Sequence, residues 1–500
     1  MTRSTFFIII IFISTFKHLL RGEETIADVW IQNGAVIDGL GGPAVKVDIL
    51  IMDDEIYYVG KLPEDVIAAD TIDACGLVVT PGFIDPHAHG NPFDTPEFNN
   101  FTSMGVTTIA LGQDGSSANT SDLIKLIEDT DKLKLGPNIA LFVGHGTIRN
   151  LSGINYKRNP SNDEIQKMSD LLEEGMKAGA FGLSTGLEYT PGRYAKQFEL
   201  HELAKVVGKY DGLIMSHIRT ENDATMESDL AELFSHGDFA NIHVSHMKVV
   251  YGKGSERAEK ILQLLDQKRS QSTFNVSADV YPYLASYTTI AILFPEYALA
   301  PNHYGTVQNN RRDDLLKYVR EKVNQRNGPE ATLFGTVPYK GKTLKQVADE
   351  MSLPFEEVLV DRFGPMGGLS AAYFTMDRDL QYRFIQDPHV MISSDGSPTM
   401  YHPRGYGSFA KVIEQFVLKD SLLTLEEAIR KMSSLPARMI GIKDRGILRP
   451  GFKADILIFN PDSVQANATY DSPHQLATGF DYIFVNGKLQ SGFGQVLRKN

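Results

Sequence analysis

The sequence predicts an α/β protein, a (β/α)8 TIM-type barrel with a small β-sandwich formed by its N- and C-terminal segments. Two observations carry this prediction. Eight short apolar runs between residues 82 and 394 alternate with amphipathic stretches of helical periodicity. On both sides of this region, β-branched runs broken by Asn-Gly, Gly-Gly and Asp-Asp pairs are typical of short strands joined by tight turns.

The barrel strands are predicted from apolar runs that are too short for helices. They span residues 82–87, 106–111, 139–144, 180–185, 213–217, 242–246, 276–281 and 390–394. Between the strands, Ser161 with Glu164 and Thr424 with Glu427 match the capping boxes that begin helices. Eight such units predict a closed barrel, in which reactive side chains follow the C-terminal ends of the strands.

The connection after the seventh strand is too long for a single helix. About a hundred residues separate Tyr281 from Val390. We therefore predict an inserted subdomain over about 284–350, and insertions at that end of a barrel usually cover the active site. The barrel is assigned to residues 81–444.

The two terminal β segments, 26–80 and 445–500, are each too short to form a stable sheet alone. We expect them to pair into one sandwich. Ahead of them, Arg3 precedes the eleven-residue apolar run FFIIIIFISTF, which fits a secretion signal within residues 1–22 and is shorter than the ~20 residues of a membrane span. The predicted location is therefore secreted or extracytoplasmic. Because no clear cleavage motif follows, an uncleaved membrane anchor is the alternative.

Composition excludes several classes of partner and site. The chain has 49 basic and 62 acidic residues, and this net charge of −13 disfavours nucleic acids and acidic membranes as partners. The only cysteine, Cys75, rules out an intramolecular disulfide and a cysteine-rich zinc site. Any metal site must therefore use histidine and carboxylate ligands.

His87 and His89 lie at the end of the first predicted barrel strand, in PGFIDPHAHG. Residues two apart on a strand point to the same face, so the two imidazoles can bind one metal ion. Such a pair is a weak signal alone, since paired surface histidines are common. Its position directly after the N-terminal β segment strengthens the interpretation.

His217 and His246 end the fifth and sixth predicted strands in similar motifs, LIMSHIR and IHVSHMK. They are 29 residues apart, which is one βα unit, so neighbouring strands present them side by side. Each histidine is followed two residues later by a basic residue, which is Arg219 in the first motif and Lys248 in the second. A structural core histidine accounts for one of these motifs but not for both.

Asp395 ends the eighth strand in ISSDGSP. Its carboxylate can take a proton from a metal-bound water and pass it to a leaving amine, and the alternative is a helix N-cap. With the four histidines it forms a ring of ligand types that zinc prefers when one position stays open to water. The ring predicts metal-assisted hydrolysis.

These motifs resemble the amidohydrolase superfamily. The segments GHGTIR, GAFGLSTGLEYTPGRYA, ADVYPY and SSDGSP resemble its D-aminoacylase branch, from about Val79 to Arg404 outside the insertion. The resemblance implies zinc-dependent hydrolysis of N-acyl-D-amino acids, with a small molecule as substrate. It also implies one tight catalytic zinc held by His217 and His246, and a second, weaker site formed by His87, His89 and Asp395.

The sequence departs from this family at the end of the second strand. Family members place a cysteine there in G-N-C-G, whereas this chain has GQDG with Asp114. We expect the Asp114 carboxylate to be the third protein ligand of the tight zinc. The alternative is that Asp114 caps the turn that follows.

The substrate contacts are predicted from the same resemblance. Arg219 is the first candidate for the α-carboxylate, because an anion needs a charged partner. Tyr189 and Tyr281 look like the other binding groups of the family, and Lys248 either reaches the substrate or pairs with a neighbouring acid. The alternatives are a related enzyme acting on cyclic amides or isoaspartyl-type dipeptides, or a non-catalytic scaffold.

Overall fold

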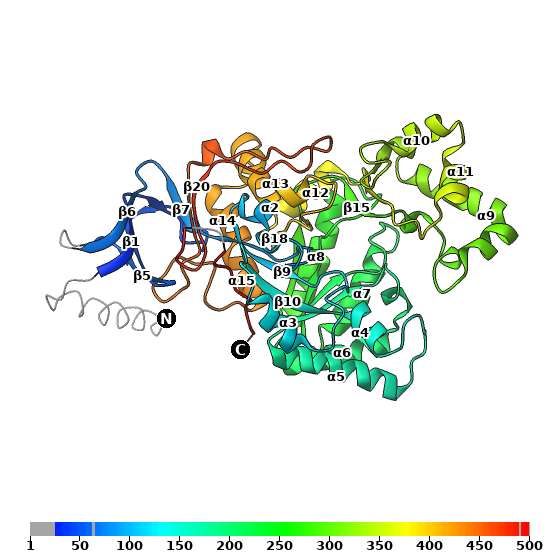
Figure 1. The fold of residues 1–500 in the computed structure, drawn as a ribbon, viewed down its shortest axis with the longest axis horizontal. Coiled ribbons are helices and arrows are strands. Elements are labelled where there is room, and N and C mark those ends of the chain that lie inside the picture. Colours follow the sequence, from blue (N-terminus) through cyan, green and yellow to red (C-terminus); the bar gives the residue numbers. More distant parts are fainter. Residues whose placement is uncertain (1–25, 63–65, 490–491, 500) are drawn as a thin grey trace.

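The computed structural model describes residues 26–62, 66–489 and 492–499, so the predicted signal segment lies outside the described residues. Figure 1 shows three parts in a row: a β-rich end formed by the first strands, a central barrel, and a mainly helical end that carries α9 (Tyr304–Gln325), α10 (Leu344–Met351) and α11 (Phe355–Glu357). Among the described residues, no helix has the length and apolar character needed to cross a bilayer.

The central barrel contains all eight predicted strands, and neighbouring strands pair in parallel in chain order. The strands are β8 (Phe83–Asp85), β9 (Val106–Leu111), β10 (Asn138–Gly144), β11 (Gly182–Gly186), β12 (Leu213–His217), β13 (Asn241–Val244), β14 (Val276–Val280) and β18 (Val390–Ile392). They are buried on both faces, which explains why they read as continuous apolar runs.

The barrel closes just beyond β8 and β18, where the two chain segments form a parallel bridge between Ala88 and Gly396. The amide of Asp395 donates to the carbonyl of His87 at 2.9 Å, and the amide of His89 donates to the carbonyl of Gly396 at 2.7 Å. We call this pair of backbone hydrogen bonds the closing seam. Two of the predicted metal ligands from strand one therefore lie directly against strand eight.

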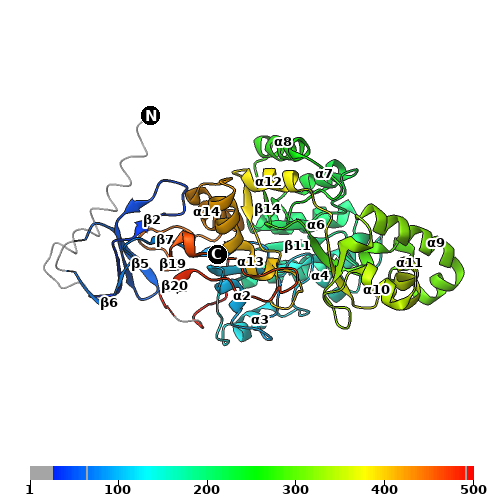
Figure 2. The ribbon, with the colours of Figure 1, turned by 90° about the horizontal axis from the view of Figure 1, so that it is seen from above.

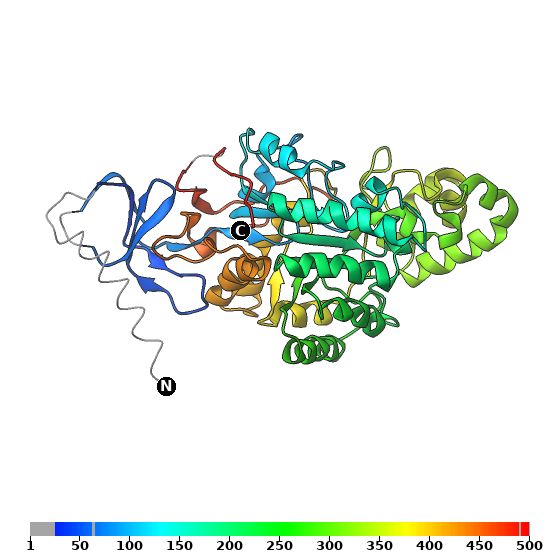
Figure 3. The same ribbon diagram turned by 90° about the horizontal axis from the view of Figure 1, so that it is seen from below.

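Helices pack around the barrel, as Figures 2 and 3 show from above and below. They are α2 (Asn99–Thr102), α3 (Leu123–Thr130), α4 (His145–Leu151), α5 (Asn162–Ala178), α6 (Gln197–Lys209), α7 (Met226–His236), α8 (Ser255–Gln271), α12 (Arg378–Gln386), α13 (Arg404–Lys411), α14 (Leu425–Met432) and α15 (Ser434–Ile440). The predicted capping box of α5 is complete, and Thr424 caps α14 by accepting from the amide of Glu427.

The terminal segments form the predicted β-sandwich. One sheet has the order β5 (Glu55–Gly60), β4 (Asp48–Met52), β1 (Ile26–Gln32) and β6 (Ile67–Asp73). The other has the order β20 (Phe480–Phe484), β19 (Ile456–Phe459), β7 (Val78–Pro81), β2 (Ala35–Val36) and β3 (Val45–Lys46). A shared core that includes Ile51, Val79 and Ile458 joins them. Since β7 continues into β8, the sandwich anchors the first barrel strand.

The insertion forms a compact unit with its own core. Its sheet has the order β15 (Ser286–Thr289), β17 (Ser370–Tyr373) and β16 (Thr332–Phe334). Its buried apolar side chains run from Ile290 to Tyr373, so the packing continues past residue 350, where we placed its end. The reason is β17, which is the central strand of the sheet and pairs with both other strands.

Candidate active site with a metal centre

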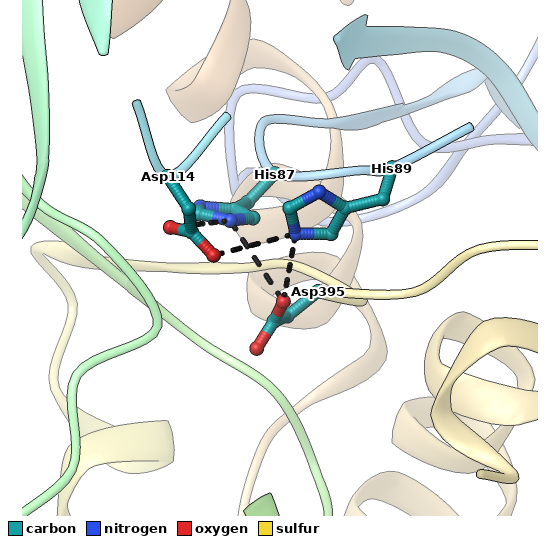
Figure 4. A group of neighbouring side chains, drawn as sticks. All are labelled: His87, His89, Asp114 and Asp395. Atoms are coloured by element: carbon teal, nitrogen blue, oxygen red, sulfur yellow. Dashed lines mark hydrogen bonds and ion pairs between the residues drawn. The ribbon is translucent and has the colours of Figure 1, made fainter. Parts of the chain in front are cut away.

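Four of the predicted ligands meet at the closing seam (Figure 4). His87 Nε2 lies 3.3 Å from Asp114 Oδ1 and 3.8 Å from Asp395 Oδ1. His89 Nε2 lies 3.5 Å from Asp114 Oδ2 and 3.1 Å from Asp395 Oδ1. Two imidazoles and two carboxylates thus point toward one another from the ends of β8, β9 and β18.

A second group shares Asp114 with the first. Its Oδ1 lies 3.1 Å from His246 Nε2 and 3.8 Å from His217 Nδ1, and these two histidine nitrogens are 2.9 Å apart. The six predicted ligands therefore come together as two groups joined by one carboxylate. The Asp114 carboxylate faces histidines from three strands, in the position where the resemblance placed a cysteine.

These residues fit a metal ion. His87 is fully buried, and neither of its ring nitrogens has a hydrogen-bond partner. Burial lowers the pKa of His87, which favours the neutral imidazole that binds metals. Burial opposes protonation of His89 too, but hydrogen bonds from its ring to Asp114 and Asp395 raise its pKa to about 9. The carboxylates therefore attract positive charge to this position.

Three of the predicted ligands have a left-handed backbone, with φ of 54° at Asp114, 36° at His246 and 48° at Asp395. Aspartate and histidine adopt this region more often than most residues, yet it stays uncommon outside glycine. Each of these residues follows a strand, so the turn directs its side chain toward the centre of the barrel mouth. The surrounding structure must hold these conformations in place.

Two buried carboxylates hold the backbone at or next to three of the predicted ligands. Asp85 accepts hydrogen bonds from the amides of His87 at 3.1 Å and Ser394 at 3.0 Å. Asp279 accepts from the amide of His246 at 3.0 Å and lies 2.5 Å from Nε2 of His243. His243 therefore positions a carboxylate that holds the backbone of a predicted ligand.

Two further acids, which sequence reasoning missed, contact the outer nitrogens of the histidines. Glu188 Oε2 lies 3.2 Å from His217 Nε2, and Glu221 Oε1 lies 3.1 Å from His246 Nδ1. Burial alone would raise the pKa of Glu221, but Lys248 and the two histidines lower it to about 2. Glu188 belongs to the motif LEYTPG and Glu221 to SHIRTE. The position of Glu221, four residues after His217, is the sequence feature that could have identified it.

The other candidate binding residues differ in their access to the site. Tyr189 lines the cavity and its ring lies 4.5 Å from that of His217. Lys248 donates to Glu221 at 2.6 Å, so it pairs with a neighbouring acid. Tyr281 is completely buried and packs against Lys248 and the guanidinium of Arg404 at 5.7 and 4.8 Å from its ring centre, so it supports these cations from beneath.

The two arginines of the site have different partners. Arg219 donates to both carboxylate oxygens of Glu232 at 2.7 and 2.8 Å and to the carbonyls of Arg193 and Ala195. It lines the cavity, but most of its N–H groups already bind protein atoms. Arg404, which we did not predict, is 3% exposed, and its Nη1 lies 2.8 Å from Asp395 Oδ2.

A cavity of about 810 Å³ opens above the ligands, between the barrel mouth and the insertion. Its wall includes His89, Asp114, His217, His246 and Asp395 on the barrel side. The insertion contributes Tyr287, Ile292, Tyr318 and Lys322 among others. A volume in this range is typical of small-molecule sites. Because residues of the insertion form part of the cavity wall, the insertion covers the site as the sequence predicted.

Comparisons with known proteins agree with this chemistry. The model of the amidohydrolase family matches residues 383–488. An N-acyl-D-glutamate deacylase from Alcaligenes xylosoxydans xylosoxydans is 33% identical over 92% of this chain and 93% of its own length.

Solved structures give the same match. The N-acyl-D-glutamate deacylase of Bordetella bronchiseptica, complexed with zinc and a phosphonate that mimics the tetrahedral intermediate, has a TM-score of 0.81 and 31% identity, covering 95% of this chain and 100% of that one. A D-aminoacylase with a binuclear metal centre has a TM-score of 0.80 and 27% identity, covering 94% of this chain and 100% of that one.

Proposed function

Because this chain belongs to the N-acyl-D-amino-acid deacylases of the amidohydrolase family, and is thus a hydrolase of amide C–N bonds, we propose that it cleaves N-acyl-D-amino acids to a carboxylate and a free D-amino acid. One observation carries the proposal. Six metal-ligand side chains converge at the C-terminal ends of the barrel strands, at the base of a cavity large enough for such a substrate.

We propose that zinc is held by Asp114, His217 and His246, with a second, weaker position at His87, His89 and Asp395 to which Asp114 also contributes. Bound zinc polarises the acyl carbonyl and lowers the pKa of water toward 7. The convergence of the two ligand groups on Asp114 supports this assignment. The zinc of the Bordetella relative supports the choice of metal.

Asp395 is the proposed general base and acid. Burial would raise the pKa of its carboxyl, but Arg404 and His246 lower it below the usual range, so the group is ionised at neutral pH. An ionised carboxylate beside the ligands can accept the proton of the attacking water and deliver it to the departing amino group. The contact with Arg404 fixes the orientation of that carboxylate.

The substrate α-carboxylate needs a cation beside the reacting amide. We assign this role to Arg404, which lines the cavity next to Asp395, with the Tyr189 hydroxyl as a second donor. Arg219 is the weaker candidate because its guanidinium is bound to Glu232 and to two carbonyls.

A substrate panel tests the function. N-acetyl-D- and N-acetyl-L-amino acids, a dihydropyrimidine and an isoaspartyl dipeptide are incubated with the protein and added zinc. Release of free D-amino acids alone supports the proposal. Hydrolysis of the ring or of the dipeptide instead supports the related activities, and a protein that binds no metal and cleaves nothing is a scaffold.

The location of the protein is proposed from its sequence. Residues 1–22 have the pattern of a secretion signal, so we propose a secreted or extracytoplasmic enzyme, or one that stays anchored if the segment is not cleaved. Fractionation of cells that express the full chain tests this, since cytosolic protein with an intact N-terminus contradicts it.

A further inference from the structure

Three basic side chains lie on the cavity wall without acidic partners. Arg193, Lys322 and Arg326 all line the cavity. Within the described residues, none of the three forms an ion pair with a carboxylate, whereas the other basic residues of this wall, Arg219, Lys248 and Arg404, each have one. No carboxylate of the described residues therefore compensates these three charges.

Arg326 is the most informative of them. Its side chain is only 3% exposed, its guanidinium packs 4.7 Å from the ring centre of Tyr373, and its Nε has no hydrogen-bond partner. Arginine keeps its charge in proteins, and a buried guanidinium without a carboxylate partner is stabilised by a bound anion. A buried arginine on a cavity wall is thus prepared to bind an anion.

Lys322 lies in the last turn of α9, four residues before Arg326, which is the C-cap residue of the helix and whose amide donates to the carbonyl of Lys322. Burial, with a smaller contribution from Arg326, lowers the pKa of Lys322, and Glu188 opposes the shift. Its Nζ lies 6.0 Å from the ring centre of Tyr251. Lys322 and Glu188 line the same cavity, and Glu188 Oε2 lies 3.2 Å from Nε2 of the proposed ligand His217.

We propose that Arg193, Lys322 and Arg326 form a subsite for a second carboxylate of the substrate, distinct from the α-carboxylate. This inference rests on the proposed function, because it places the scissile amide at the ligand ring. The subsite and the ring line the same cavity, so one molecule can reach both. The preferred substrates are then dianionic, with the second carboxylate on the amino-acid side chain or on the acyl group.

Matched substrate pairs distinguish the two sources of this carboxylate. N-acetyl-D-glutamate is compared with N-acetyl-D-glutamine, and N-succinyl-D-alanine with N-succinamoyl-D-alanine. Lys322→Met is expected to lower kcat/KM at least ~10-fold, mainly through KM, for the charged member of one pair, because a charged partner of the carboxylate is lost. The neutral members should change less than about twofold.

Lys317→Met on the exposed side of the same helix is the control, and it should leave all four substrates unaffected. Arg326→Met is a second variant, but its packing on Tyr373 makes the Lys322 variant the more secure test. Calorimetric binding of glutarate to the wild type and to Lys322→Met gives a measurement that needs no turnover.

The outcomes separate this inference from the proposed function. If no acyl amino acid is cleaved, the proposed function fails, and weaker glutarate binding by Lys322→Met still supports the anionic subsite. If N-acetyl-D-methionine is cleaved but Lys322→Met changes neither the charge preference nor glutarate binding, the subsite is overturned and the function stands.

Discussion

Asp114 Oδ1 lies 3.1 Å from His246 Nε2 and faces both groups of histidines, so a single carboxylate connects the two candidate metal positions. We predict that Asp114→Ala lowers metal content and activity together, and that Asp114→Cys restores zinc binding, because thiolate and carboxylate are both competent zinc ligands. Because carboxylate is the harder ligand, manganese or cobalt should compete better in the wild type than in the cysteine variant.

Metal analysis of the purified variants after zinc loading measures this effect. Asp462→Ala, an exposed acid on the surface, serves as the control. Full metal content with normal rates in Asp114→Ala would falsify the role of Asp114 as a ligand.

Asp395→Asn should retain the fold and most of the metal while kcat falls at least ~100-fold, the low end of a general acid–base contribution. Circular dichroism and metal content establish that the variant is intact, and steady-state kinetics measures the loss. A kcat within threefold of the wild type removes Asp395 from the proton transfer.

Arg404→Met should raise KM for acyl amino acids much more than for the same substrates with an amidated α-carboxyl group, since the charged contact is lost. Arg219→Met is the matched comparison. Because Arg219 holds Glu232 and the carbonyls of Arg193 and Ala195, its loss should lower Tm and slow both substrate forms to a similar extent. A selective KM effect in Arg219→Met instead assigns the α-carboxylate to that residue.

His236 is 2% exposed, and burial lowers its pKa to about 3 from an unfolded value of 6.5. The folded protein therefore keeps this ring neutral while the unfolded chain takes up a proton. Its contribution to stability is complete above pH 6.5 and is lost as the pH falls toward 3, at up to about 1.4 kcal/mol per pH unit.

Denaturant titrations between pH 7 and pH 4 measure this slope. His236→Phe should show a shallower pH dependence than the wild type, whereas the exposed His389→Gln should not. Parallel curves for the wild type and His236→Phe contradict the prediction.

The barrel could be predicted because parallel strands buried on both faces need continuous apolar runs, and the histidines after β8, β12 and β13 follow those runs directly. The contact of Arg404 with Asp395 could not be predicted. Arg404 lies nine residues beyond Asp395, and the spacing does not determine how the loop between them folds back. The resemblance placed Tyr281 in the binding site, yet its ring is enclosed beneath Lys248 and Arg404. The ion pair of Arg219 with Glu232 could not be predicted either, because nothing in the sequence around Glu232 indicates that it faces Arg219.

The closing seam gives the metal centre a mechanical consequence. His89 and Asp395 are 306 residues apart in the chain. Their contact therefore connects the first and last strands of the barrel and closes a very large loop. A cation bound between these two side chains stabilises the closing seam. Its removal should therefore make the closing seam open more readily than the rest of the barrel. The amide hydrogens of His89 and Asp395, which form the seam, should then exchange with deuterium faster after chelation, while those in the middle of β11 and β12 keep their protection.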